Sequence, residues 1–181
     1  EHLSQLVRDV LLFAKPADPE REAAQLETIL EHSMLMVEKE LTEKKIQVNR
    51  GYGEDLPPVD VDQGMMAQAF INILINAIDA MDEGGRLHIR TTTSPQEPGF
   101  VILEIEDDGC GIEEEHMSSL FNPFFSRKKY GTGLGLAQVK KIMDVHGGRI
   151  EIFSVGGKGT KVVMMIPVSQ SRQHGPEGRK G

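Results

Sequence analysis

The segment QGMMAQAFINILINAIDAMDE, residues 63–83, decides the fold because its pattern is that of one long helix with two unlike sides. At about 100° per residue, a narrow polar arc lies opposite a broad apolar side. Asp62 directly precedes the segment and is a residue type that caps helix N-termini. We therefore predict a half-buried helix that ends near residues 82–85, DEGG. The polar arc comprises Gln68, Asn72, Asn76 and Asp79, and the apolar side comprises Met66, Ala69, Phe70, Ile73, Leu74, Ala77 and Ile78.

The polar arc is unusual because it contains two asparagines. Asparagine is a mediocre helix former, and burying its amide without a partner costs about 1–3 kcal/mol. A helix face in bulk solvent usually carries Lys, Glu and Arg instead. We therefore expect the arc to face a polar ligand, water or a metal ion, and bulk solvent is the alternative.

The rest of the apolar pattern predicts a sheet. In FVILEIED, residues 100–107, apolar residues alternate with glutamates at the period of a half-buried strand. Grouped helices and mostly antiparallel strands predict an α+β fold, a two-layer α/β sandwich with a mixed, mostly antiparallel sheet and helices on one face. Helices are expected at residues 21–45 and from 137 onward, turns at 51–60, and strands at 45–50, 86–93, 100–107, 148–155 and 159–168. We also expect Met34, Met36, Met143, Met164 and Met165 to lie in the core.

Composition excludes several classes of protein. The 181 residues carry a net charge of -8 without a long basic stripe, which argues against a nucleic-acid partner. Cys110 is the single cysteine and cannot form an internal disulfide. Apolar runs stay well short of the roughly 18 residues that span a bilayer, so we expect a cytoplasmic fragment of a longer protein that makes no membrane contact itself.

The first residues have the pattern of a helical bundle. Leu3, Val7, Val10 and Ala14 follow each other at spacings of four and three residues, and Pro16 then breaks the pattern. We expect a helix at residues 1–15, a linker at 16–21, one domain at 22–168 and a disordered tail at 169–181.

Two glycine-rich segments point to a ligand site. GTGLGL, residues 131–136, precedes a helical pattern and would present backbone N–H groups and a helix N-terminus to phosphate, or simply form a tight turn. It matches neither the P-loop nor the GxGxxG pattern. DDGCGI, residues 107–112, ends a predicted strand, and its Asp107 could accept a hydrogen bond from an exocyclic amine, bind metal or cap a turn.

Together the motifs carry a resemblance. NILINAIDA, DDGCGI, LFNPFF, GTGLGL and GKGT occur in the order of the N, G1, F, G2 and G3 boxes of sensor histidine kinases, within the ATP-binding superfamily that includes gyrase, Hsp90 and MutL. Residues 22–168 resemble the catalytic and ATP-binding domain, of the Bergerat type. Residues 1–15 resemble the end of the second helix of the dimerisation and phosphotransfer domain. The residue sequences of the motifs are most similar to those of nitrogen-regulation and sporulation kinases.

The resemblance implies ATP and Mg²⁺ as cofactors. Asp107 would accept from the adenine amino group, Thr160 would support the same pocket through a water, and the amide oxygen of Asn76 would coordinate Mg²⁺. Residues 112–131 would form a lid with phenylalanine anchors at 121, 124 and 125, and its basic triplet at 127–129 would lie beside the phosphates or in solvent. The catalytic residues implied are Asn72, Asn76 and Lys128, and the ATP-binding residues are Asn76, Asp107, Gly109, Gly111, Lys128, Gly131, Thr132, Gly133, Leu134, Gly135, Leu136 and Thr160.

The implied activity is transfer of the ATP γ-phosphate to a histidine on a dimerisation domain, followed by relay to a response regulator. Asn72 stands where ATPases of the superfamily carry glutamate, and an amide cannot take a proton from water, so hydrolysis should be poor. The alternatives are a gyrase-like or Hsp90-like ATPase and a nucleotide-binding interaction module. None of the six histidines is followed by glutamate, as the family's phosphoacceptor is, so we expect no self-phosphorylation by this chain alone.

Overall fold

The computed structural model of the chain describes residues 18–126 and 131–169. The predicted bundle helix at 1–15, the basic triplet at 127–129 and nearly all of the predicted tail lie outside the described residues, and the domain limits stay predictions. Within the described part, no helix combines the length and the apolar character that crossing a membrane requires.

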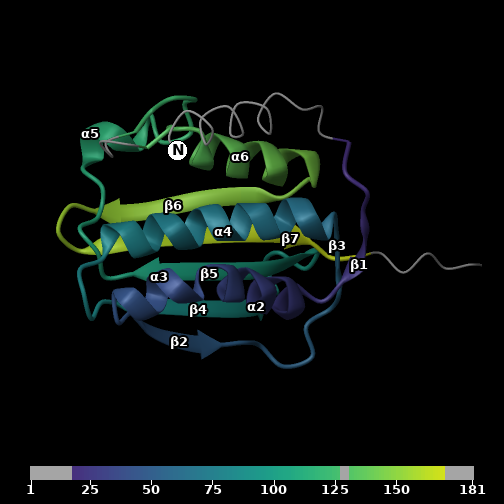
Figure 1. Cartoon of the computed structure of the whole chain (residues 1–181). Helices are drawn as coiled ribbons and strands as arrows, with labels where there is room; N and C mark the ends of the chain where they lie inside the picture. Colours follow the sequence, from purple (N-terminus) through teal and green to yellow (C-terminus); the bar gives the residue numbers. More distant parts are fainter. Residues whose placement is uncertain (1–17, 127–130, 170–181) are drawn as a thin grey trace, which may run out of the picture.

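The main sheet confirms the predicted α+β architecture. It has five strands in the order β2-β4-β5-β7-β6, of which only the β2–β4 pair is parallel. Helices α2, α3, α4 and α6 lie on one side of the sheet (Figure 1). The strands are β2 (Gln47–Gly51), β4 (Arg86–Thr93), β5 (Phe100–Asp107), β6 (Arg149–Val155) and β7 (Gly159–Pro167), and the helices are α2 (Leu26–Met36), α3 (Glu38–Glu43), α4 (Gln63–Ala80), α5 (Glu114–Met117) and α6 (Gly135–Val145).

Helix α4 is the predicted two-sided helix. The Asp62 side chain accepts a hydrogen bond from the Met65 backbone N–H at 3.0 Å, which confirms the N-cap. The buried residues of α4 are the seven apolar residues of the predicted apolar side. Each large side chain removed from water in this way contributes about 1.5–3 kcal/mol of stability, so α4 is held mainly by its packing on the sheet and on its neighbouring helices.

The prediction of a helix at 21–45 is wrong for its N-terminal part. Strand β1 (Glu22–Ala24) pairs antiparallel with β3 (Val59–Val61), a strand that falls where mostly turns were expected. Ala24 and both valines of β3 are buried, so backbone pairing and burial in this small sheet outweigh the helix propensity of residues 22–24. The predicted helix also breaks at Val37, between α2 and α3.

The prediction of a core position is wrong for two of the five methionines. Met34, Met143 and Met164 are buried, but Met36 is 69% exposed at the end of α2 and Met165 is only partly buried. The buried positions of α2 lead on to Val37, whereas Met36, the last residue of α2, lies about 90° around the helix from the centre of the buried stripe. Met165 alternates with the buried Met164 along β7 and therefore faces the other side of the sheet.

Helices α4 and α6 are joined at one end by a buried histidine. Nε2 of His146, the residue that follows α6, accepts from the Asp62 backbone N–H at 3.0 Å, and its Nδ1 lies 2.7 Å from the Ile142 carbonyl. This arrangement requires a neutral ring with the proton on Nδ1. Burial lowers the pKa of His146, which keeps the ring neutral at physiological pH.

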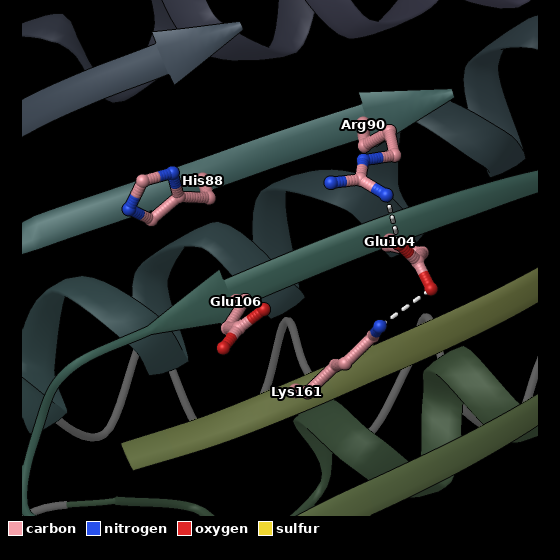
Figure 2. A pocket seen from close by; sticks show the side chains of 5 residues that line it. All are labelled: His88, Arg90, Glu104, Glu106 and Lys161. Atoms are coloured by element: carbon pink, nitrogen blue, oxygen red, sulfur yellow. Dashed lines mark ion pairs between the residues drawn. The ribbon is translucent and has the colours of Figure 1, made fainter. Parts of the chain in front are cut away.

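The face of the sheet opposite these helices carries a cluster of charged and polar side chains. His88, Arg90, Glu104, Glu106 and Lys161 line a shallow hollow there (Figure 2). Glu104 lies between two cations, 2.6 Å from Lys161 and 3.9 Å from Arg90. Strand β5 therefore directs Val101, Leu103 and Ile105 toward the core and its glutamates toward solvent, as the alternating pattern predicted.

Candidate functional site

A row of three polar residues crosses the sheet near one end. Asp107 on β5 pairs with Thr160 on β7, and Thr160 pairs with Ser154 on β6. Paired residues of neighbouring strands point to the same face of a sheet. Asp107 is in phase with the buried Ile105, so this row lies on the helix-covered side of the sheet, among mostly apolar side chains.

Asp107 is a nearly buried carboxylate. Only 7% of the residue is exposed, and its side chain accepts from the backbone N–H of Gly109 at 2.9 Å and from the backbone N–H of Thr160. Burial raises the pKa of Asp107 to about 6, even though both hydrogen bonds favour the charged form. A buried acceptor with a perturbed pKa is typical of functional sites.

The next residue, Asp108, is in a different environment. It is exposed, and it accepts from the backbone N–H and the Nε of Arg86 at 2.8 and 2.9 Å. The hydrogen bonds from Arg86 hold the pKa of Asp108 below its ordinary value. The sequence DD therefore contains one residue that faces the helix-covered side of the sheet and one that forms a surface ion pair.

The glycines of DDGCGI are required by packing. A Cβ on Gly109 would lie 2.5 Å from the Ala80 carbonyl oxygen at the end of α4. Gly111 has φ of +67°, and a Cβ there would lie 2.1 Å from the Val155 carbonyl oxygen. The turn thus fits between α4 and the end of β6, which fixes the backbone beside Asp107. Contact of these two glycines with a nucleotide stays a prediction.

The polar arc of α4 meets the first turn of α6. The Asn72 side-chain NH₂ donates to Gln138 Oε1 at 3.2 Å and to the Gly135 carbonyl at 3.4 Å, and its oxygen accepts from Gln68 at 3.2 Å. This part of the arc faces protein groups rather than bulk solvent. Asn76 lies one helical turn further along α4 and is partly exposed, and Asp79 is exposed. Gln138 was not predicted as a site residue, because a glutamine on a helix gives no signal without its partner.

The LFNPFF and GTGLGL motifs are in contact. The Phe124 backbone N–H donates to the Gly133 carbonyl at 3.0 Å, and a Cβ on Gly133, whose φ is +70°, would lie 2.4 Å from the Phe124 carbonyl carbon. Of the three phenylalanines expected to anchor this segment, Phe124 does not: its own φ is 67° and it is 68% exposed. Phe121 packs against the core, and the Phe125 ring lies 5.8 Å from that of His116.

Two groups of the predicted site residues are therefore found next to α4, one at the end of the sheet and one at the start of α6. Asp107 and Thr160 are paired, and Asn72 contacts Gly135 at the start of α6, where buried Leu134 fixes the loop that leads into the helix. Lys128 lies outside the described residues. Ser154, the third member of the polar row, was not predicted, because a lone serine on a strand has no distinctive pattern.

The protein atoms at this site can bind a metal ion only if a bound phosphorylated ligand supplies most of the coordinating oxygens. Among residues 18–126 and 131–169, no cluster of three or more His, Cys, Asp or Glu side chains could hold a metal. The amide oxygen of Asn76 is a single hard donor, and Mg²⁺ commonly combines one or two protein ligands with phosphate oxygens and waters. The residues present fit a cation that arrives with a phosphorylated ligand.

Comparison with known proteins identifies similar chains. The family described as histidine kinase-, DNA gyrase B- and HSP90-like ATPase matches residues 61–170. Sensor histidine kinase ZraS of Escherichia coli (strain K12) is 31% identical over 178 residues, which are 98% of this chain and 37% of ZraS. Sporulation kinase E of Bacillus subtilis (strain 168) is 30% identical over 173 residues, which are 96% of this chain and 23% of that kinase. The chain thus spans well under half the length of these relatives.

Solved structures of histidine kinase ThkA have the same fold. Its isolated catalytic domain is 28% identical, with a TM-score of 0.73 over 82% of this chain and 96% of that domain. A second structure contains ThkA in complex with the response regulator protein TrrA, and there the similarity reaches a TM-score of 0.76 at 25% identity, over 92% of this chain and 47% of ThkA.

Proposed function

This chain belongs to the family of histidine kinase-, DNA gyrase B- and HSP90-like ATPases, and we propose that it is the ATP-binding catalytic domain of a sensor histidine kinase. The observation that carries this choice is the extent of the similarity. The family match begins at residue 61, whereas the sensor kinase relatives align with 96–98% of the chain and therefore include most of its first 60 residues. Similarity to gyrase or Hsp90 would not account for that N-terminal part.

ATP would be held by its two ends. The adenine amino group would donate to the Asp107 carboxylate, which is already fixed by the backbone N–H groups of Gly109 and Thr160. The phosphates would lie near the loop at 131–136 and the N-terminus of α6, because the backbone N–H groups and the dipole of a helix N-terminus favour anions. Lys128 would add a cation from the lid.

The Asn76 amide oxygen would help to hold Mg²⁺, which when bound would neutralise charge on the transferred group. Asn72 would lie beside this position without acting as a base. Its amide cannot accept a proton from water, and it is already bonded to α6 through Gly135 and Gln138. The site therefore supports transfer to a positioned histidine better than hydrolysis.

The acceptor histidine would be on a dimerisation and phosphotransfer domain of the same protein, which would act as a homodimer. The phosphoryl group would then pass to a response regulator, a partner for which the ThkA–TrrA complex is the precedent. Because ATP is supplied in the cytoplasm, the domain would work there.

Two measurements test the proposal. Calorimetry should show Mg·ADP binding to the chain. Incubation with γ-labelled ATP should leave the chain itself unlabelled but should label a separately supplied bundle domain from the same protein that carries a histidine followed by glutamate. A matched bundle domain with that histidine changed to glutamine is the control. Acid-labile label on this chain alone, or rapid hydrolysis without transfer, would contradict the proposal.

A further inference from the structure

Ser154 has a single hydroxyl proton and three hydrogen-bonding neighbours. Its Oγ lies 2.9 Å from the Ile112 backbone nitrogen, 2.8 Å from the Gly159 carbonyl oxygen and 2.9 Å from Thr160 Oγ1. A hydroxyl offers one donor and two acceptor positions, so these neighbours use the full capacity of the side chain.

The roles of the three neighbours follow from proton counting. The Gly159 carbonyl can only accept, so the Ser154 proton is committed to it. The Ile112 N–H can only donate, so it takes one lone pair of Ser154. The remaining contact then requires Thr160 to donate its own hydroxyl proton to Ser154. Thr160 Oγ1 consequently meets any further neighbour as an acceptor.

This fixed orientation matters because Thr160 is paired with Asp107 on the same face of the sheet. The Asp107 carboxylate is also an acceptor when it is charged. The row therefore presents two acceptors side by side, at the point where the base of a nucleotide would be read. A group with two N–H donors matches this arrangement, whereas a carbonyl oxygen is repelled by it.

We propose that Ser154 is a positioning residue for base selection: by holding the Thr160 hydroxyl as an acceptor, it makes the pocket selective for a 6-amino purine over a 6-oxo purine. The inference rests on the proposed function, because it assumes that Asp107 and Thr160 face the base. Without Ser154, the Thr160 hydroxyl can rotate and donate to a 6-oxo group, directly or through a water.

The test compares Mg·ADP with Mg·inosine diphosphate, which carries an oxygen in place of the 6-amino group. Two variants of nearly equal shape separate hydroxyl from packing: Ser154→Thr keeps the hydroxyl and Ser154→Val removes it. Calorimetry should show that Ser154→Thr keeps the preference for ADP. Ser154→Val should reduce that preference about threefold to tenfold, which corresponds to one net hydrogen bond.

A double variant shows that the effect passes through Thr160. Thr160→Val alone should also reduce the preference, and adding Ser154→Val should reduce it no further. An unchanged preference in Ser154→Val, or an equal further loss in the Thr160→Val background, overturns the role of Ser154. If Ser154→Val does not fold, Thr160→Val still decides, since an unchanged preference there rejects the inference.

A failure of the proposed function looks different. Wild-type chain that binds ADP and inosine diphosphate equally, or binds neither, would contradict the adenine site itself. Wild-type selectivity that persists in every variant of Ser154 and Thr160 would leave the adenine site in place and reject only the positioning role.

Discussion

Asp107 and Asp108 are neighbours in the chain, yet they belong to different regions of the molecule. Asp107 ends the core-facing side of β5, where burial raises its pKa to about 6. Asp108 begins the surface turn, where Arg86 donates two hydrogen bonds and lowers its pKa. The charged form of the same residue type is therefore destabilised at position 107 and stabilised at position 108. The comparison separates a carboxylate suited to ligand binding from one that stabilises the fold.

The largest expected difference between the two concerns nucleotide binding. Asp107→Asn replaces an acceptor by an amide whose NH₂ group can face the adenine amino group. Loss of a hydrogen bond to a charged acceptor, with an unfavourable donor added, should weaken Mg·ADP by roughly 100-fold. Asp108→Asn is the matched control and should change the affinity by less than about twofold, because its partner is Arg86 at the surface.

Calorimetry of both variants measures this difference. Equal losses in the two variants would show that the effect comes from the turn rather than from one carboxylate. An unchanged ADP affinity in Asp107→Asn would remove Asp107 from the base pocket.

The sequence predicted the parts of the fold that depend on local periodicity. The apolar side of α4, its Asp62 cap and the strands β4 and β5 follow from residue spacing alone, and all are found. Strand β1 was missed because its helix-forming residues are held extended by pairing with residues of β3 that lie 35 to 39 positions away along the chain. Propensity carries no information about such a distant partner.

The site shows the same limit. Asp107 could be singled out because the turn DDGCGI follows a strand, but nothing in DD indicates which aspartate is buried until the strand register is known. The sequence identified Asn72 as an unusual polar residue on α4, whereas its partner Gln138 depends on the packing of α4 against α6. Ser154 acts through three contacts that involve separate segments, so no local motif reveals it.

The second difference between the aspartates concerns stability, and it should have the opposite sign from binding. The folded state raises the pKa of Asp107 from 3.8 to about 6, so it binds more protons than the unfolded chain between these values, and stability falls as pH rises through this window. At pH 7.5 the charged carboxylate therefore costs stability. Asp107→Asn should gain on the order of 2 kcal/mol without ligand, because an amide carries no charge to desolvate.

Urea denaturation at several pH values checks this sign. The advantage of Asp107→Asn over wild type should be largest near pH 7.5 and should shrink as pH falls through 6 toward 4, where Asp107 is protonated. A variant that is less stable than wild type at pH 7.5 would mean that the hydrogen bonds from Gly109 and Thr160 outweigh desolvation.

The smallest effect is expected for Asp108→Asn in the same denaturation experiment. Its pKa is lowered by the hydrogen bonds from Arg86, so its charge stabilises the fold at neutral pH, and that contribution is lost as pH falls below the ordinary range of an aspartate. The Arg86–Asp108 ion pair is solvent-exposed, however, with the two side chains 62% and 38% accessible. Surface pairs of this kind contribute about 0.2–1 kcal/mol, so the variant should lose a few tenths of a kcal/mol. Because exposed charges are screened, the loss should shrink further between 0.05 and about 1 M NaCl, while the gain in Asp107→Asn persists. Equal salt dependence of the two variants would show that Asp107 is as accessible to solvent as its neighbour, and the contrast between the two regions would fail.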